Sequence, residues 1–169
     1  MGRIYIQKAS ERDKTNRNIY QMLQSIDQEE HGFMNGGYGI SWEEYPGYIE
    51  KLIAQYEAPE LEKGYVPQTI YWLMNDEEVL GYSKMRHYLT DKLRAHGGHI
   101  GYGIRKEQRN KGYGKKLLEL TLNEIKRLDV NDVLITCDES NRGSRKVIEW
   151  NNGVLEKIEH EHCYYWIKI

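Results

Sequence analysis

The chain has 169 residues, and its 24 basic and 26 acidic side chains leave a formal net charge of only −2 at pH 7. This balance argues against nucleic acid or an anionic membrane as a partner, and no apolar run approaches the ~20 residues of a membrane span. Hydrophobic residues make up 39% of the sequence, enough for the core of a single domain over residues 1–169.

The two cysteines, Cys137 and Cys163, are too few for a disulfide framework and lack the spacing of metal ligands. The N-terminal residues run directly into strand-like sequence, without the apolar region of a signal peptide. We therefore expect a cytoplasmic protein that binds no metal.

The N-terminal part of the chain predicts one strand and two helices. Residues 3–8 alternate in polarity, as in a half-exposed strand. A helix is expected from about 11 to 28, because its apolar residues fall on one face. Glycines between 32 and 39 predict a loop, and Ser41 can cap a second helix that reaches Glu57.

The middle of the chain predicts three strands. Residues 69–74 and 79–87 form a hairpin around a polar turn of four residues. A short helical piece over 91–95 ends at two glycines, and residues 99–104 form the next strand.

The C-terminal part predicts two helices that alternate with strands. An amphipathic helix covers 112–128, and the short apolar run 133–137 is typical of a fully buried parallel strand. A helix over 142–151 follows, and the strands 154–158 and 164–169 close the chain as a hairpin. This order predicts a mixed α/β fold with one sheet and helices on both faces.

The segment from His99 to Gly114 carries the clearest chemical signal. A strand enters a loop with two glycines at the point where a helix begins, and the first turn of a helix presents free N–H groups. That arrangement suits a phosphate group. Basic side chains add positive charge around it: Arg105, Lys106, Arg109, Lys111, Lys115 and Lys116. The alternative is a glycine-rich connection whose basic residues are only solvated.

Two common nucleotide motifs are excluded by spacing. Gly101 and Gly103 are not followed by a glycine at position 106, so the dinucleotide fingerprint is absent. No Gly-Lys-Ser/Thr follows the loop, which excludes a P-loop.

Two short motifs resemble one enzyme family. Arg109-x-x-Gly112-x-Gly114, which follows a strand and opens a helix, is similar to the acetyl-CoA pyrophosphate loop of the GNAT (Gcn5-related N-acetyltransferase) superfamily. Asn141-x-x-Ser144 resembles the motif of that family at the next strand-to-helix junction. Stretches such as 66–73 and 134–138 are further similar to a bacterial branch of predicted acetyltransferases that brings no substrate with it.

The resemblance implies a fold and a cosubstrate. The fold is a single GNAT-type central sheet, mixed but mostly antiparallel, with splayed middle strands at 99–104 and 133–137 and helices on both faces. The cosubstrate is acetyl-CoA, held between those strands. The residues that the resemblance assigns to it are Gly103, Ile104, Arg105, Arg109, Asn110, Lys111, Gly112, Tyr113, Gly114, Lys115, Asn141 and Ser144.

The resemblance also implies direct transfer of the acetyl group to an amine, without a covalent enzyme intermediate. Cys137 is therefore interpreted as a small core residue rather than a nucleophile. Many family members use a tyrosine seven residues after the asparagine as the general acid, and Ile148 stands there in this sequence. Possible substitutes, each of which can also be a packing residue, are Tyr102, Tyr113, Tyr164 and Tyr165.

The candidate catalytic residues are His99 and Tyr102 on the cofactor strand and Glu30 at the exit of the first helix. His87 is a further candidate base, and a structural role is open for each histidine. Glu30 belongs to an acidic stretch, residues 27–62, with nine acids and one lysine. Those acids either attract an amine or are merely solvated, and we expect a cationic or amine-bearing small acceptor.

The leading hypothesis is an N-acetyltransferase that acts on a primary amine of a small molecule. The alternatives are a non-catalytic acyl-CoA-binding regulatory module, which the isoleucine at position 148 would favour, and an unrelated phosphate-binding protein. A protein acceptor also stays open. The aromatic segment Tyr164–Trp166 either pairs with a second subunit, giving a homodimer, or closes the sheet.

Overall fold

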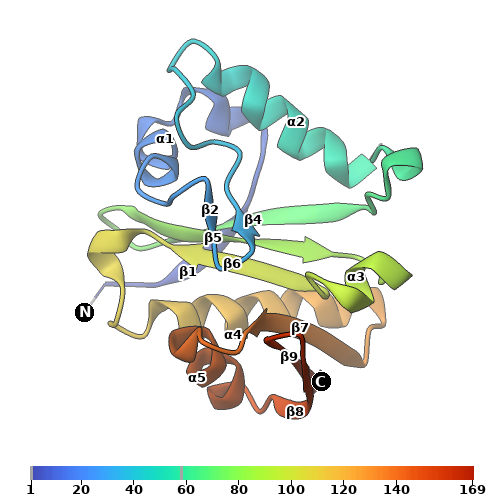
Figure 1. Cartoon of the computed structure of the whole chain (residues 1–169). Helices are drawn as coiled ribbons and strands as arrows, with labels where there is room; N and C mark the ends of the chain where they lie inside the picture. The colour runs from blue at the N-terminus through green and yellow to red at the C-terminus, as the bar shows by residue number, and fades with distance from the viewer. Residues whose placement is uncertain (1, 58) are drawn as a thin grey trace.

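Two antiparallel sheets form the framework of the computed structural model, which describes residues 2–57 and 59–169 (Figure 1). The four-stranded sheet has the order β1-β4-β5-β6 and consists of Tyr5–Lys8, Gln68–Met74, Val79–Arg86 and Ile100–Ile104. The three-stranded sheet has the order β7-β9-β8 and consists of Asp132–Asp138, His162–Lys168 and Val154–Glu159.

Two hydrogen bonds join the sheets where β6 begins. The backbone N–H of His99 donates to the carbonyl of Leu134 at 2.8 Å, and the N–H of Leu134 donates to the His99 Nδ1 at 2.9 Å. Past these residues β6 has no ladder with β7 in the described part of the chain, and the two strands diverge. The predicted splayed sheet is therefore confirmed. The prediction of a parallel ladder for 133–137 is wrong, because β7 bonds antiparallel to β9.

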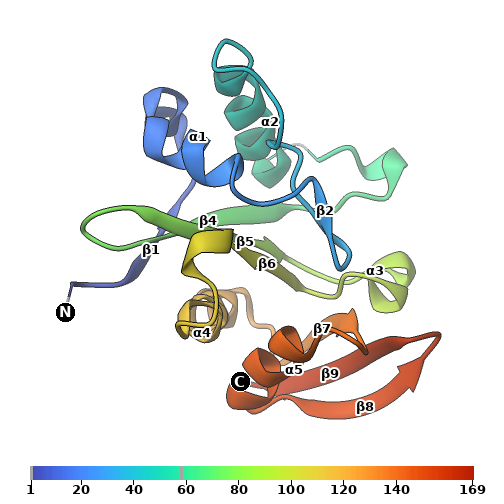
Figure 2. The same cartoon turned by 60° about the vertical axis from the view of Figure 1, so that its left-hand side comes forward.

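Helices cover both faces of the four-stranded sheet, as Figures 1 and 2 show. On one face, α1 (Arg17–Leu23) and α2 (Tyr45–Glu57) bury a core that includes Ile19, Ile49 and Trp72. On the other face lies α4 (Tyr113–Ile125), whose apolar side packs on β7 and β9 as well. Two shorter helices, α3 (Asp91–Ala95) and α5 (Arg142–Trp150), flank the three-stranded sheet. No helix described is long and apolar enough to cross a membrane.

The helix predicted over 11–28 is broken at Asn16. A 3-10 helix, η1 (Glu11–Thr15), precedes α1, and the Asn16 side chain accepts hydrogen bonds from the first turn of α1. Asp13 adds a second local constraint, since its carboxylate accepts from Ser10 N–H and from the Trp72 indole. These caps end one helix and start another although the apolar periodicity continues through both.

A small hairpin occupies part of the predicted glycine loop. Strands β2 (Glu29–Glu30) and β3 (Phe33–Met34) are joined by His31 and Gly32, whose φ angles are 51° and 87°. Two consecutive positive φ values are the signature of a type I′ turn, which matches the twist of short hairpins.

The remaining connections are short. Single 3-10 turns form η2 (Leu61–Lys63), η3 (Lys106–Gln108) and η4 (Lys126–Leu128). The last of these completes the helix predicted to reach residue 128.

The C-terminal strand β9 lies between β7 and β8, so both of its edges are already bonded. No edge of β9 is left for a second subunit to pair with, and of the two expected roles of Tyr164–Trp166 the structure has the second. These residues close the sheet, and β8 forms its outer edge.

Gly98 lies at the junction of the two sheets and should tolerate no side chain. A Cβ there would lie 2.4 Å from the Leu134 carbonyl oxygen, and its φ is +61°. We expect Gly98→Ala to lower the free energy of unfolding by about 3 kcal/mol or more. Gly39→Ala, at φ +82° with open space around it, is the control and should cost only about 1 kcal/mol. Urea denaturation measures both, and equal losses would contradict the close contact at the junction.

Candidate active site

The loop between β6 and α4 presents a row of free backbone donors. Gly112 caps α4 with a φ of 87°, and Asn110 adopts a φ of 61°. The backbone N–H groups of residues 110–115 have no hydrogen-bond partner among the residues that the structure describes. They lie at the positive end of a 13-residue helix. This geometry suits a pyrophosphate, as the sequence predicts.

The basic side chains around this loop divide into two groups. Arg105 pairs with Glu78 and Glu107, and Lys106 pairs with Asp27 at 2.6 Å. Further along, Lys116 pairs with Glu119 and Arg109 pairs with Glu30. Lys111 and Lys115 form no ion pair with a described acid. They are therefore the side chains around the loop whose charge is not neutralised by a described acid.

Arg109 and Glu30, predicted for different roles, are in direct contact. The guanidinium donates to both Glu30 carboxylate oxygens, at 2.5 and 2.8 Å, and its Nε donates to the Ile104 carbonyl at 2.9 Å. The hydrogen bond from Arg109 is the main reason why the pKa of Glu30 lies below its usual value. A carboxylate held in this way is a weak base, which disfavours the catalytic role expected for Glu30.

His99, the second candidate base, has a structural role, because it links the two sheets by hydrogen bonds to Leu134. Its ring is 5% exposed and its Nδ1 accepts the N–H of Leu134. Burial, together with Arg94 and Arg86, lowers the pKa of His99 to about 4, so the ring is neutral at pH 7. Its burial and its hydrogen bond to Leu134 therefore favour a role in joining the sheets over a role in proton transfer.

Tyr102, Asn141 and Ser144 come together at the wedge between β6 and α5. The Tyr102 hydroxyl lies 2.7 Å from the Ser144 Oγ, and the Asn141 Oδ1 accepts the Ser144 N–H at 3.1 Å, capping α5. Burial raises the pKa of Tyr102, so its hydroxyl stays protonated. Ile148, at the position of the usual general acid, is fully buried.

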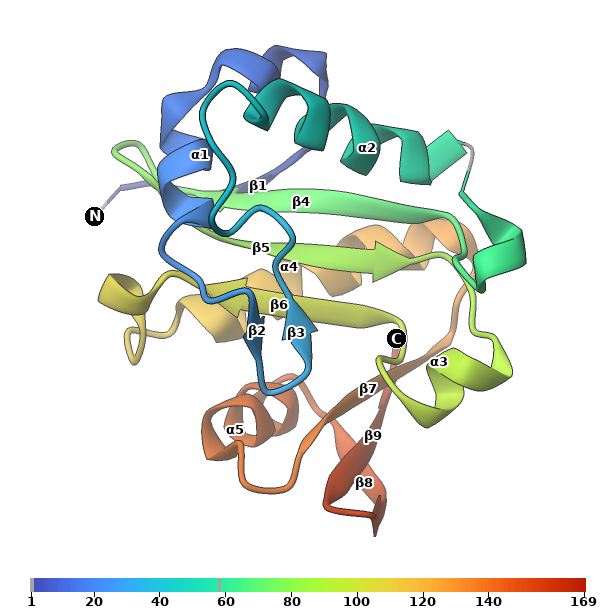
Figure 3. The ribbon, with the colours of Figure 1, turned by 45° about the horizontal axis from the view of Figure 1, so that its top comes forward.

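The β2–β3 hairpin covers the face of β6 that points away from α4 (Figure 3). The Phe33 ring lies so close to the strand that a Cβ on Gly103 would be 2.9 Å from it. Lys84 on β5 holds the hairpin through a 2.5 Å hydrogen bond to the Met34 carbonyl. Desolvation, followed by repulsion from Arg86, lowers the pKa of Lys84 to about 8. The hairpin therefore covers Gly101 and Gly103, the two glycines of β6.

A histidine–aspartate cluster lies where β7 ends and the hairpin turns. One Asp138 oxygen is 3.3 Å from His31 Nδ1, and the other is 3.2 Å from His162 Nδ1. The His96 ring packs edge-on against His162 at 4.9 Å between centroids. A cavity of about 460 Å³ adjoins the cluster, lined by Asp138, Glu139, Ser140, His160, Glu161 and His162.

Neither Asp138 nor His162 was singled out as a site residue from the sequence. Asp138 directly follows the apolar run 133–137, and a polar side chain at the end of a buried strand is the one local signal that points to it.

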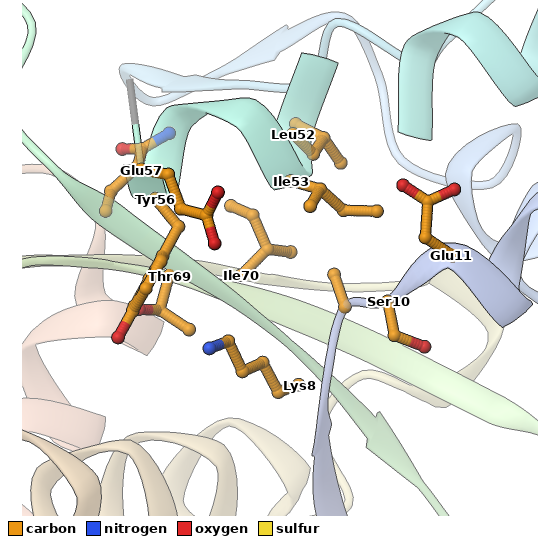
Figure 4. Close-up of a pocket in the computed structure, with 11 residues that line it drawn as sticks. Lys8, Ser10, Glu11, Leu52, Ile53, Tyr56, Glu57, Thr69 and Ile70 are labelled. Carbon is orange, nitrogen blue, oxygen red and sulfur yellow. The ribbon is translucent and has the colours of Figure 1, made fainter. Parts of the chain in front are cut away.

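A second cavity, of about 330 Å³, lies between α2, β4 and the end of β1 (Figure 4). Its walls are mainly apolar and include Leu52, Ile53 and Ile70, with Lys8 and Glu57 at the rim. None of the predicted site residues lines it.

Comparison with known proteins identifies the family. The model of the acetyltransferase (GNAT) domain matches residues 3–153, so the chain belongs to this family and is an acetyl-CoA-dependent acyltransferase. In sequence, no curated protein matches the chain.

Solved structures share the fold at low identity. RimL, a ribosomal L7/L12 α-N-protein acetyltransferase solved with coenzyme A, has a TM-score of 0.71 and 17% identity, covering 98% of this chain and 94% of its own. The ribosomal-protein-S5-alanine acetyltransferase of Vibrio fischeri has a TM-score of 0.69 and 14% identity, covering 99% and 96%. YncA of Salmonella typhimurium, solved with its cofactor acetyl-CoA, has a TM-score of 0.62 and 10% identity, and the match covers 98% of this chain and 93% of its own.

The buried neutral His99 should make stability depend on pH. Its folded pKa of about 4 lies below the unfolded value of 6.5, so the unfolded state binds more protons between these values. Stability from this group is complete above pH 6.5 and falls by about 3 kcal/mol as the pH approaches 4. We expect His99→Asn, which keeps an acceptor for Leu134 but does not titrate, to flatten this slope. Urea unfolding at pH 6.5 and 5 measures it, and parallel slopes would rule the explanation out.

Proposed function

We propose that the chain transfers the acetyl group of acetyl-CoA directly to a primary amine. The first candidate acceptor is the amine of a small molecule. The observation that carries the proposal is the row of free N–H groups over 110–115, which adjoins the unpaired edge of β6. A pyrophosphate at those donors would place the attached chain beside the end of β6, where β6 and β7 have no ladder in the described part of the chain.

On the cofactor side, the backbone of residues 110–115 binds the pyrophosphate, and Lys111 and Lys115 supply positive charge. Gly103 and Ile104 lie on β6, whose edge away from β5 has no ladder partner in the described part of the chain, and that edge is suited to an extended amide-bearing chain. Asn141 fixes the first turn of α5 through its bond to Ser144.

The reaction forms a C–N bond between the amine and the acetyl carbon and breaks the C–S bond, so that coenzyme A leaves as a thiolate. Holding the two reactants together supplies much of the rate. Burial raises the pKa of the Cys137 thiol to about 12, which disfavours an acetylated cysteine. Direct transfer is therefore the simpler route.

The amine must lose a proton, and the His31–Asp138–His162 cluster is suited to accept it. A carboxylate only accepts hydrogen bonds, so the His31 Nδ1 that Asp138 binds carries a proton. In a neutral ring this leaves the Nε2 lone pair free to act as a base. Asp138 orients the His31 ring and stabilises the positive charge that forms on it or on the neighbouring His162.

The departing thiolate carries negative charge, and the Tyr102–Ser144 hydroxyl pair is suited to stabilise it by donating a hydrogen bond to the sulfur. The pair lies at the N-terminal turn of α5, and burial raises the pKa of Tyr102, so its hydroxyl stays protonated and acts as a hydrogen-bond donor. This pair stands in for the tyrosine that Ile148 replaces.

An amine at a protein N-terminus is the second candidate acceptor. The overall similarity to RimL and to the Vibrio fischeri enzyme, whose names specify ribosomal proteins, favours it. A panel of small primary amines and N-terminal peptides, assayed by release of the coenzyme A thiol, separates the two classes. Binding of acetyl-CoA without thiol release for any amine would support a non-catalytic acyl-CoA-binding module instead.

Calorimetric titration of acetyl-CoA tests the cofactor loop. We expect Gly112→Asp to abolish binding, because a carboxylate there repels the pyrophosphate. A Cβ at Gly112 meets no atom within 4 Å, so the cost to the fold should be limited to the backbone strain at φ +87°, about 1 kcal/mol. Gly64→Asp is the control, since Gly64 has nearly the same φ, +85°, in the connection between α2 and β4. Failure of the folded wild-type protein to bind acetyl-CoA would refute the proposed site.

Replacement of Asp138 tests the proton acceptor. Asp138→Asn removes the charge that stabilises a protonated ring, and we expect kcat/KM for the amine with the highest turnover in the panel to fall about 100-fold or more. Asp132→Asn, at the other end of the same strand, should leave kcat/KM unchanged. Equal activity of both variants would exclude the cluster from catalysis.

A further inference from the structure

The end of α1 and the hairpin after it are attached to the cofactor loop by a set of polar contacts. Ser25 Oγ donates to Glu107 at 2.6 Å, and the Ser25 carbonyl accepts the N–H of Lys106 at 3.2 Å. Lys106 Nζ also reaches Asp27 at 2.6 Å. The connection that leads into β2 therefore runs along η3, directly before the phosphate-binding residues.

The strongest of these contacts is the ion pair between Arg109 and Glu30. It is bidentate, and the two side chains are only 34% and 27% exposed. Parallel charge-assisted hydrogen bonds fix direction as well as distance, unlike the exposed pair of Lys106 and Asp27. The Ile104 carbonyl holds the Nε of the same guanidinium, so one side chain joins the end of β6, the cofactor loop and β2.

The hairpin depends on contacts of this kind for its order. With two residues in each strand, it is too short to be stable by itself. Glu30 attaches its first strand to the cofactor loop, while Phe33 covers Gly101 and Gly103 and His31 reaches Asp138. The hairpin thus connects the loop suited to the pyrophosphate with the cluster suited to the amine.

We propose that Arg109 and Glu30 form a latch through which occupation of the cofactor loop orders the β2–β3 hairpin, so that the amine site is completed after the cofactor binds. The proposal rests on the proposed role of residues 110–115 as the phosphate site. Arg109 is on this account a positioning residue: its guanidinium acts on the hairpin, and the neighbouring backbone N–H groups act on the phosphates.

Coupling of this kind is reciprocal. If coenzyme A stabilises the latched hairpin, the latched hairpin strengthens the binding of coenzyme A by the same factor. Breaking the latch should therefore loosen the hairpin and weaken cofactor binding together, although Glu30 does not lie in the phosphate loop.

Hydrogen–deuterium exchange with coenzyme A as the probe tests the latch without knowledge of the acceptor. In the wild-type protein, saturating coenzyme A should slow exchange of the amides in residues 29–34 by about fivefold or more. In Glu30→Gln this protection should disappear at saturation, and the Kd of coenzyme A should rise by a similar factor. Asp27→Asn, which breaks the exposed neighbouring pair, is the matched control and should behave like the wild type.

Arg109→Lys provides a second variant that keeps the charge but loses the planar fork, and it should also lose the protection. Two results would overturn the latch: unchanged exchange in the hairpin of a wild-type protein that binds coenzyme A, or faster exchange there, as expected if Arg109 leaves Glu30 for the phosphates. Absence of coenzyme A binding by the wild type would instead refute the cofactor site itself.

Discussion

The rest of the structure depends on the pair of hydrogen bonds between His99 and Leu134, because they are the point where two separately bonded sheets become one framework. The imidazole takes the place of a carbonyl acceptor, and no backbone ladder forms between β6 and β7 in the described part of the chain. From there β6 and β7 diverge, and α4 packs against both. The residues proposed for catalysis lie on or beside these two diverging strands, so the ring of His99 contributes to function by fixing their arrangement.

The division of charge around the opening has a physical logic. Acidic residues of the connection after α1 neutralise Lys106 and Arg109. The positive charge that stays free is close to the first turn of α4, where an anion gains most from the helix dipole. A uniform cluster of cations would attract phosphate without fixing its position. Here most of the cations are paired with acids, and the pairs of Lys106 and Arg109 link the cofactor loop to the segment after α1.

Much of this molecule could be predicted from its sequence, because the helices and long strands have strong periodicity and the phosphate loop is contiguous. The hairpin over 29–34 could not, since two-residue strands have no alternation and a His-Gly turn is a weak signal. The break at Asn16 was hidden by apolar residues that keep their spacing across it. The Asp138 cluster and the use of Arg109 depend on partners about 24 to 107 residues away, which local patterns do not reveal.

The divergence of β6 and β7, which form no ladder in the described part of the chain, also bears on the energetics of substrate entry. Inserting an extended molecule into a sheet normally requires two strands to be pulled apart, with the loss of their backbone hydrogen bonds. Here the separation is already part of the ground-state fold, maintained by α4 and by a histidine that titrates far below neutral pH. A guest strand therefore only gains bonds along β6, and the reorganisation energy of binding is kept small.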